Sequence, residues 1–343
     1  MCYKKFIRPI LFRMDPERVH NAALFFGSLL GRIWIKRKVL ELIYLYKDER
    51  LNLEVKGIKF DNPVGLAAGF DKNGVLTEII PSFGFGFEEI GSITAEQCEG
   101  NKKPRVFRIP EEKGLIVNYG LPSDGAESVL RRLRKKKFKI PIGINIAKTN
   151  DSRIKGESSV EDYFKSYKLL KDIGDYITIN ISCPNVGDGR SFEDPKLLEK
   201  LLKKIGKTDK IIFLKISPDV SKERLNRIIK ISKKYSVSGF VISNLIKNAK
   251  GALSGLPVKE KADELIKYVY RKTKGRFVII GVGGIFSAED AYTKIRNGAS
   301  LVQLVTGMIY EGPGIAKNIN KGLIILLKKD GFREIREVIG VDA

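Results

Sequence analysis

Eight short apolar runs alternate with helical stretches from about residue 60 onward, and this alternation constrains the fold more than any other feature of the sequence. Continuous apolar runs of this length are typical of strands buried on both faces of a parallel sheet, and parallel strands need crossover helices between them. Eight such units predict an α/β fold of the closed (β/α)8 type, the TIM barrel. The runs are Asn62–Ala68, Phe87–Ile93, Ile140–Ile146, Tyr176–Ser182, Ile211–Ser217, Gly239–Asn244, Phe277–Gly283 and Leu301–Thr306.

An open, doubly wound sheet is the alternative for a chain that alternates strands and helices. In that fold the glycine-rich phosphate loop usually follows the first strand. Here the richest glycine cluster, Gly281-Val282-Gly283-Gly284, follows the seventh run, and Thr306-Gly307 follows the eighth. Barrels commonly hold phosphate after strands seven and eight, where glycines permit close approach of the backbone to a ligand. The position of the glycines therefore favours the barrel and predicts an anion site.

The first 50 residues do not follow this alternation. Asp15-Pro16-Glu17 combines a helix N-cap, a proline suited to the first helical position and an acidic first turn, so a helix is predicted to begin there. A second helical stretch is predicted across Leu29–Tyr46. We therefore expect two parts, a helical extension over residues 1–50 and a barrel domain over residues 51–343.

The extension combines apolar helical positions with eleven Lys or Arg and five Asp or Glu residues. Its most apolar stretch, Leu24–Tyr46, is interrupted by charges, whereas a membrane-spanning helix needs about 20 mostly apolar residues. We expect it to lie peripherally on an anionic lipid surface, at the cytoplasmic face of a membrane. The pattern fits equally well an amphipathic helix pair packed on the barrel. The apolar positions are Leu24, Phe25, Phe26, Leu29, Leu30, Ile33, Trp34 and Ile35.

The whole chain carries a formal net charge of +23, which favours anionic neighbours such as phosphate groups or acidic lipids. The excess is spread over segments such as 131–137 that are typical of solvated helix faces, and no nucleic-acid partner is expected. The three cysteines, Cys2, Cys98 and Cys183, have no CxxC or metal-ligand spacing, so neither a disulfide framework nor a metal site is expected. No cleavable signal peptide is evident at the N-terminus.

Polar residues follow most of the apolar runs, at the end of the predicted barrel where active sites lie. The fifth run carries Lys215 among apolar neighbours, and a buried lysine needs an anionic or polar partner. The fourth run leads into Asn180-Ile181-Ser182-Cys183-Pro184-Asn185 and the sixth into Ser243-Asn244. These positions predict a polar ligand site over the carboxyl ends of the strands.

Four segments of the chain resemble dihydroorotate dehydrogenases. They are Asn-Pro-Val-Gly-Leu-Ala-Ala-Gly-Phe-Asp-Lys-Asn-Gly from Asn62, Gly-Asn-Lys-Lys-Pro-Arg-Val-Phe-Arg from Gly100, Asn-Ile-Ser-Cys-Pro-Asn from Asn180 and Ile-Ile-Gly-Val-Gly-Gly-Ile from Ile279. Asp-Pro-Glu-Arg-Val-His from Asp15 is similar to the start of the quinone-linked class, which carries an N-terminal helical extension. The resemblance runs from about residue 5 to about residue 325.

The resemblance implies an FMN enzyme of pyrimidine biosynthesis that oxidises dihydroorotate to orotate and passes electrons to a membrane quinone. A flavin suits this chemistry because it accepts a hydride in one half-reaction and releases electrons in the other. The implied FMN contacts are Ala67, Ala68, Ser92, Asn145, Asn180, Lys215, Ser243, Gly255, Gly283, Gly284, Thr306 and Gly307. The implied substrate contacts are Lys72, Asn118, Asn180, Asn185 and Asn244, and the implied quinone-site residues are His20 and Arg105.

Cys183 occupies the position of the family's catalytic base, which removes the C5 proton of the substrate while the C6 hydride goes to the flavin. A thiol, with an ordinary pKa of about 8.5, ionises far more readily than a hydroxyl. Quinone-linked members generally have serine here, and cysteine is typical of the soluble class that uses fumarate or NAD. The segment Gly120-Leu121-Pro122 also looks like the soluble class, so these acceptors remain alternatives to quinone.

Three further positions depart from the family pattern. Val117 stands where a substrate-binding asparagine is usual, with Asn118 one residue late, and Leu245 replaces a threonine. Val305 stands where a tyrosine is common near the quinone tunnel. These departures leave two alternatives open: a flavin barrel that acts on another pyrimidine, including uridine in RNA, and a non-catalytic, membrane-bound flavin barrel. The sequence does not specify the oligomeric state.

Overall fold

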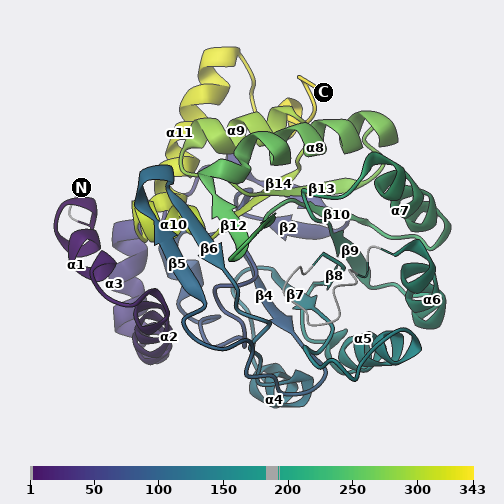
Figure 1. Ribbon diagram of the computed structural model, residues 1–343. Coiled ribbons are helices and arrows are strands. Elements are labelled where there is room, and N and C mark those ends of the chain that lie inside the picture. Colours follow the sequence, from purple (N-terminus) through teal and green to yellow (C-terminus); the bar gives the residue numbers. More distant parts are fainter. Residues whose placement is uncertain (1–2, 183–191, 193) are drawn as a thin grey trace.

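The computed structural model describes residues 3–182, 192 and 194–343, and it contains a closed barrel of eight parallel strands ringed by helices (Figure 1). Each of the eight predicted runs contains one barrel strand, so the predicted TIM barrel is confirmed. Around the barrel the order is β10-β13-β14-β3-β4-β7-β8-β9. The strands are β3 (Val64–Leu66), β4 (Phe87–Ile93), β7 (Ile142–Ile146), β8 (Tyr176–Asn180), β9 (Ile211–Lys215), β10 (Gly239–Ile242), β13 (Val278–Val282) and β14 (Leu301–Leu304).

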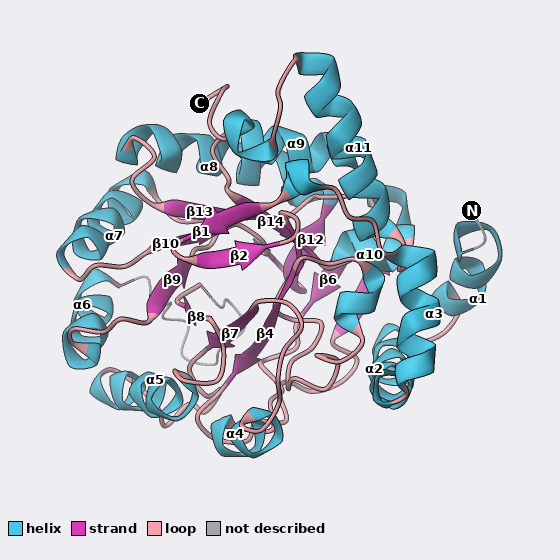
Figure 2. Cartoon of the chain, turned by 180° about the vertical axis from the view of Figure 1, so that it is seen from behind, coloured by secondary structure: helices cyan, strands magenta, loops and turns pink. Residues whose placement is uncertain are grey.

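Helices cover the outside of the barrel and bury its apolar outer face (Figure 2). One connection differs from the predicted alternation, because β3 and β4 are joined by a loop with a single 3-10 turn. The helices are α4 (Ala126–Leu133), α5 (Glu157–Leu170), α6 (Pro195–Ile205), α7 (Lys222–Lys234), α8 (Lys259–Thr273), α9 (Ala288–Arg296), α10 (Thr306–Glu311) and α11 (Ile315–Asp330). The 3-10 turns are η2 (Glu49–Leu51), η3 (Ile80–Phe83), η4 (Pro110–Glu112), η5 (Leu256–Val258) and η6 (Ile335–Val338).

The N-terminal segment is helical as predicted. It contains the π-helical turn η1 (Tyr3–Ile7), α1 (Arg8–Phe12), α2 (Pro16–Arg32) and α3 (Trp34–Tyr44). The predicted start of α2 is confirmed, because the Asp15 carboxylate accepts a hydrogen bond of 2.8 Å from the Arg18 amide. The second helix begins later than predicted, because Ile33 is extended (φ −98°, ψ 106°) and separates α2 from α3.

One face of α2 packs on the barrel domain. A Cβ atom on Gly27 would lie 2.7 Å from the Leu76 side chain, and one on Gly31 would lie 3.2 Å from Glu78. Most of the exposed large apolar side chains of the described residues nevertheless lie within residues 6–43. The extension therefore both packs on the barrel and presents an apolar surface. No helix in the described part of the chain has the length and apolar content needed to cross a bilayer.

Two small antiparallel sheets complete the structure. A hairpin of β1 (Leu53–Val55) and β2 (Ile58–Phe60) precedes the barrel. A four-stranded sheet, not predicted from the sequence, has the order β11-β12-β6-β5. Its strands are β5 (Val106–Ile109), β6 (Gly114–Val117), β11 (Ile246–Asn248) and β12 (Gly251–Gly255).

The four-stranded sheet joins two distant excursions of the chain. Strands β5 and β6 follow β4, whereas β11 and β12 follow β10. In the barrel order β4 and β10 stand four places apart, on opposite sides. The two excursions meet where Ala252 of β12 pairs with Val117 of β6. The sheet therefore bridges the mouth of the barrel at the carboxyl ends of its strands, next to α10 (Figure 1).

Candidate functional site

A cavity of about 510 Å3 lies at the carboxyl ends of the barrel strands, under the four-stranded sheet. Its barrel end is lined by polar side chains and glycines, and its other end is lined by apolar side chains of α1, α2, η3 and the loop before η3. The polar end contains Lys72, Ser92, Asn180, Ser182, Lys215, Asn244, Ser254 and Thr306. The apolar end contains Leu11, Val19, Ala23, Phe26, Leu30, Leu76, Ile79, Ile80 and Phe83.

Glycines form one wall of the polar end. Gly255, Gly283 and Gly284 have φ values of +101°, +97° and +71°, a conformation that L side chains rarely adopt. A Cβ atom on Gly283 would lie 2.4 Å from the Ser243 carbonyl oxygen, and one on Gly307 would lie 2.0 Å from the Ile285 carbonyl oxygen. Only glycine fits these positions, and the bare backbone lets a flat or phosphorylated ligand approach closely.

Most of the predicted cofactor contacts meet at this cavity. Asn145 and Ser243 do not line it and are fully buried behind it. The Ser243 hydroxyl donates a 2.8 Å hydrogen bond to the Ile216 carbonyl oxygen. The predicted contacts that do line the cavity are Ala67, Ala68, Ser92, Asn180, Lys215, Gly255, Gly283, Gly284, Thr306 and Gly307.

A buried carboxylate inside the barrel holds this wall in place. Glu89 Oε1 accepts a 2.7 Å hydrogen bond from Asn145 Nδ2, and Asn145 Oδ1 accepts one of 2.5 Å from the Ser92 hydroxyl. Ser92 in turn accepts a 2.9 Å bond from Asn180 Nδ2. Glu89 Oε2 accepts bonds from Thr178 and Gln303, each at 3.0 Å. Glu89 is not among the predicted site residues, although an acidic residue inside an apolar run was the signal that could have identified it.

The predicted substrate residues and the predicted base divide into three groups. Lys72, Asn180 and Asn244 line the cavity, and Asn244 Nδ2 donates a 3.1 Å bond to the Ser254 hydroxyl. Asn118 does not line it, because its Oδ1 accepts a 2.8 Å bond from Asn101 Nδ2 and Val117 occupies the wall instead. This placement does not support the predicted contact of Asn118 with substrate. Cys183 and Asn185 lie outside the described residues.

Asn244 presents an unused acceptor at the polar end. Its Oδ1 atom is buried and has no hydrogen-bond partner within the described part of the chain. A buried acceptor without a donor costs about 1–3 kcal/mol, so a ligand that donates a hydrogen bond at this point would be favoured.

Lys72 and His20 join the polar and apolar ends of the cavity. Lys72 Nζ lies 3.3 Å from His20 Nε2 and 4.1 Å from the centre of the Tyr119 ring. Burial lowers the pKa of Lys72 to about 8, Glu17 opposes this shift, and Arg105 adds to it. Burial and the charge of Lys72 lower the pKa of His20 to about 3. At neutral pH the imidazole is therefore uncharged and accepts from the Lys72 ammonium through Nε2.

Arg105 does not line the cavity, which does not support its predicted contact with quinone. Its side chain is 7% exposed, and its Nη2 and Nε atoms lie 2.7 and 3.2 Å from the Glu17 carboxylate. Burial alone would raise the pKa of Glu17, but the hydrogen bonds and charges of Arg105 and Lys103 outweigh burial and lower it. Arg105 therefore fixes α2 to the loop before β5.

Arg108, three residues later, lines the cavity in its place. Its Nη1 atom donates a 2.7 Å bond to the Met14 carbonyl oxygen, and its guanidinium lies 4.8 Å from the centre of the Phe12 ring. Val106 and Arg108 share one face of β5 and both line the cavity, because side chains two apart on a strand point the same way. Because side chains alternate between the two faces of a strand, the sequence Val106–Ile109 could have shown that Arg108 shares a face with Val106.

The family model for dihydroorotate dehydrogenase matches residues 50–327 of this sequence. This chain belongs to the dihydroorotate dehydrogenase family. A dihydroorotate dehydrogenase (quinone) of Nostoc punctiforme is 38% identical, covering 99% of this chain and 98% of its own length. One from Christiangramia forsetii is 40% identical, covering 94% of this chain and 98% of its own length. The crystal structure of ligand-free dihydroorotate dehydrogenase from Eimeria tenella superposes with a TM-score of 0.84 at 29% identity and covers 96% of this chain and 99% of its own.

Membership of the dihydroorotate dehydrogenase family confirms the predicted relationship, the predicted oxidoreductase activity and FMN as the cofactor. Both relatives carry the word quinone in their names, in agreement with the predicted acceptor class. Cysteine at position 183 therefore departs from the serine that is usual at this position in quinone-linked members, although the relatives named here are quinone-linked.

In a dihydroorotate dehydrogenase, orotate binding should weaken as Lys72 loses its proton. We expect the dissociation constant of orotate to rise about tenfold per pH unit above about pH 8, because its carboxylate needs the ammonium group. The measurement is orotate titration of the holoenzyme followed by flavin absorbance. Lys72→Arg keeps its charge throughout this range and should bind independently of pH. The same pH dependence in the arginine variant would assign the effect to another group.

Glu89→Gln should disturb the active site without unfolding the barrel. An amide at this position would bring an N–H group against the donors that now bond to the carboxylate, so Ser92 and Asn180 would lose their alignment. We expect kcat to fall about tenfold or more, with a shifted flavin absorption spectrum.

The neighbouring Glu88 provides a matched control for Glu89. Glu88 is also fully buried, and burial followed by the charge of Asp71 raises its pKa well above the ordinary range. Neither of its carboxyl oxygens has a hydrogen-bond partner within the described residues, so Glu88→Gln breaks no hydrogen bond and should leave kcat and the spectrum unchanged. Equal losses in the two variants would show that any change in this strand disturbs catalysis and that Glu89 has no specific positioning role.

Proposed function

We propose that this chain oxidises dihydroorotate to orotate in pyrimidine biosynthesis, using FMN, and passes the electrons to a quinone that enters between α2 and the barrel. The observation that carries the proposal is one continuous cavity whose polar end reaches Lys72 and Asn244 and whose apolar end opens along α2. A small anionic heterocycle suits the polar end, and the ring and tail of a quinone suit the apolar end.

The residues present fit FMN. The wall of Gly255, Gly283 and Gly284 leaves space and bare backbone for a flat ring and a phosphate, and Lys215 supplies a positive charge in the same cavity. Bound there, the flavin would accept two electrons from the substrate and pass them to a second acceptor.

Different side chains of the cavity would bind the substrate and face the quinone. Lys72 would pair with the substrate carboxylate, and the amides of Asn180 and Asn244 would fix the pyrimidine ring by hydrogen bonds. The uncharged His20 and the cationic Arg108 would face the quinone end. Cys183, which lies outside the described residues, is proposed as the base that takes the C5 proton.

Residues 1–50 are proposed to attach the protein peripherally to an anionic lipid surface, at the cytoplasmic face of a membrane. Helices α2 and α3 support this because they expose Phe25, Leu29, Trp34 and Leu42 beside many basic residues. Interfacial helices combine such an apolar face with cationic side chains. Residues 51–343 are proposed as the catalytic domain.

The test is anaerobic mixing of the holoenzyme with dihydroorotate, followed by separate reoxidation with quinone, fumarate and NAD. We expect the flavin absorbance to bleach and to recover fast only with quinone. No bleaching would favour a non-catalytic flavin barrel, and fast recovery with fumarate or NAD would reassign the acceptor.

A substitution that fills the apolar end should separate the two half-reactions. Ala23 of α2 lines the cavity, whereas its neighbour Ala22 does not. We expect Ala23→Trp to raise the KM for quinone about tenfold or more, because the indole occupies the space that the quinone needs, while dihydroorotate bleaches the flavin at the parent rate. Steady-state and stopped-flow kinetics measure the two effects. Ala22→Trp is the matched control, and an equal rise of KM in this variant would exclude entry along α2.

A further inference from the structure

A second cavity lies on the other side of α2 and shares no lining residue with the flavin cavity. Its volume is about 460 Å3, and it lies between the α2–α3 corner and the segments around Glu78 and α4. Its lining residues are Ser28, Gly31, Arg32, Arg37, Val75, Glu78, Arg132 and Lys136. Half of them are cationic and only one is acidic, so the cavity suits an anion.

The cations of this cavity are only partly neutralised. Arg37 forms an ion pair with Glu78. Arg132 forms an ion pair of 2.7 Å with Asp124, which does not line the cavity. Lys136 donates a 3.2 Å hydrogen bond to the neutral hydroxyl of Thr77. The side chain of Arg32 has no hydrogen bond or ion pair with any residue that the structure describes. Arg32 and Lys136 therefore form no ion pair with a carboxylate of the described residues.

Arg37, which lines the same cavity, also has an unused donor. Its Nη1 atom is occupied by Glu78, but its Nε atom is buried and without a hydrogen-bond partner in the described residues. Leaving a buried donor unpaired is costly, and a charged acceptor oxygen would satisfy it best. Phosphate oxygens have this chemistry, and a guanidinium binds them in a geometry suited to two parallel hydrogen bonds.

The surroundings of the cavity point to a phosphate that belongs to a lipid. Arg32 stands at the α2–α3 corner, where Leu29, Ile33, Trp34 and Ile35 are 48%, 42%, 64% and 56% exposed. Tryptophan prefers the level of lipid headgroups, and an apolar corner of this kind inserts just below them. The headgroup phosphates would then lie at the level of Arg32 and the cavity behind it.

We propose that this cavity holds the phosphate of an anionic phospholipid headgroup when α2 and α3 lie on a membrane. The proposal rests on the membrane attachment proposed above and adds a specific binding site for the lipid headgroup. Such a headgroup would also bridge α2 to α4, because Arg32 belongs to the extension and Lys136 follows α4.

The test compares vesicle binding of the full-length holoenzyme and of Arg32→Gln/Lys136→Gln. The vesicles contain either phosphatidylcholine alone or phosphatidylcholine with phosphatidylglycerol. We expect the double variant to bind the anionic vesicles about 30-fold more weakly, since each of the two cations near a lipid surface contributes about fivefold. Binding to neutral vesicles and flavin reduction by dihydroorotate should be unchanged, which confirms that the variant is folded.

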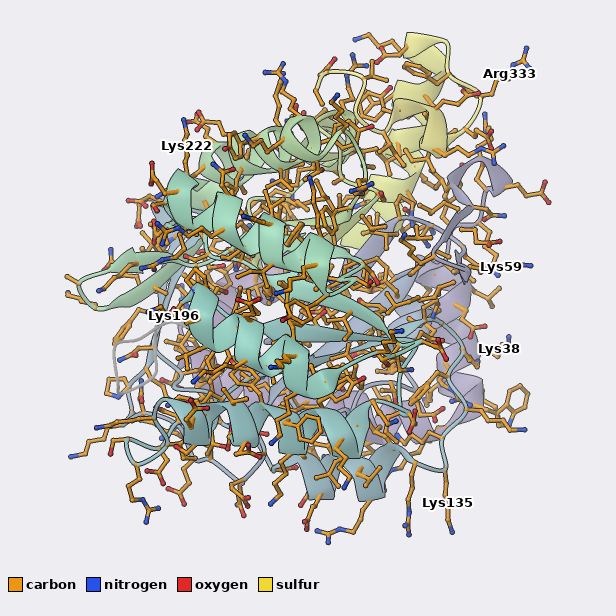
Figure 3. The ribbon with its side chains drawn as sticks, turned by 90° about the vertical axis from the view of Figure 1, so that its right-hand side faces the viewer. Lys38, Lys59, Lys135, Lys196, Lys222 and Arg333 are labelled. Carbon is orange, nitrogen blue, oxygen red and sulfur yellow. The ribbon has the colours of Figure 1, made fainter. Side chains whose placement is uncertain are left out.

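Lys196→Gln/Lys222→Gln is the matched control, because it removes the same charge from α6 and α7. These helices lie across the barrel from α2 and α3, and Figure 3 shows both lysines at the opposite edge of the molecule from Lys38 of α3. The control should bind anionic vesicles like the parent protein. An equal loss in the control would show that diffuse surface charge, not the cavity, attracts the lipid.

One further measurement and two outcomes of the vesicle comparison separate the remaining possibilities. Binding of soluble glycerol phosphate by the parent, lost in the double variant without any effect on vesicle binding, would show a site for free phosphate and overturn the lipid assignment. If the parent binds neutral and anionic vesicles equally, the headgroup site is wrong and membrane attachment stands. If the parent binds neither vesicle, the proposed attachment fails as well.

Discussion

Cys183→Ala is expected to slow the reduction of FMN by dihydroorotate by about 100-fold or more, the usual scale of a lost general base. Substrate should still bind, because Lys72, Asn180 and Asn244 are unchanged and line the cavity. Stopped-flow bleaching of the flavin measures the rate, and orotate titration measures the binding.

The serine variant sharpens this test of Cys183. Cys183→Ser should retain part of the activity with its pH profile shifted upward, because a hydroxyl ionises far less readily than a thiol whose ordinary pKa is about 8.5. If the alanine variant reduced its flavin at the parent rate over the whole pH range, Cys183 would be a packing residue and another group would have to take the proton.

Arg105→Gln is expected to lower the free energy of unfolding by roughly 3–5 kcal/mol, because it leaves the Glu17 carboxylate buried without its main partner. The pair is 7% and 10% exposed, so little solvent screening reduces this effect. Urea unfolding measures it. Arg105→Gln/Glu17→Gln should recover much of the loss, since no uncompensated charge remains.

The pH dependence of the Arg105 variant has a definite sign. The pKa of Glu17 is lowered from its ordinary value of 4.5, so the pair stabilises the fold above about pH 4.5 and loses this contribution as pH falls through the lower, folded-state value. The difference between parent and variant should therefore shrink in acid.

Arg108→Gln is the contrasting variant for Arg105. It should weaken quinone binding while changing the unfolding free energy by about 1 kcal/mol, the scale of its hydrogen bond to Met14. A large rise of the quinone KM in Arg105→Gln, without loss of stability, would restore the quinone role predicted for Arg105.

The barrel was predictable because each of its strands is a continuous apolar run, and burial on both faces produces that signal locally. The glycine wall was predictable for a similar reason, since Gly283, Gly284 and Gly307 follow strands whose order in the chain sets their place in the barrel. The Asp15 cap is likewise a local pattern, confirmed by its bond to the Arg18 amide.

The predicted site residues that lie away from the cavity depend on contacts that no local pattern determines. Asn118 and Arg105 carry plausible chemistry but stand one and three residues from Val117 and Arg108, which occupy the cavity wall. To decide which of two nearby residues faces the cavity, one must know how β5 pairs with β6. Glu89 acquires its role only when the barrel closes and brings Asn145, Thr178 and Gln303 around it.

The sheet that bridges the barrel mouth has a consequence for the order of folding. Strands β6 and β12 can pair only after β4 and β10 have taken their places on opposite sides of the barrel, and Ala252 is 135 residues from its partner Val117 in the sequence. Closing so long a loop is entropically costly and slow unless the intervening strands are already joined. We therefore expect the four-stranded sheet, with Gly255 at its edge, to be the last part of the chain to form. FMN is then expected to bind a barrel that has already closed.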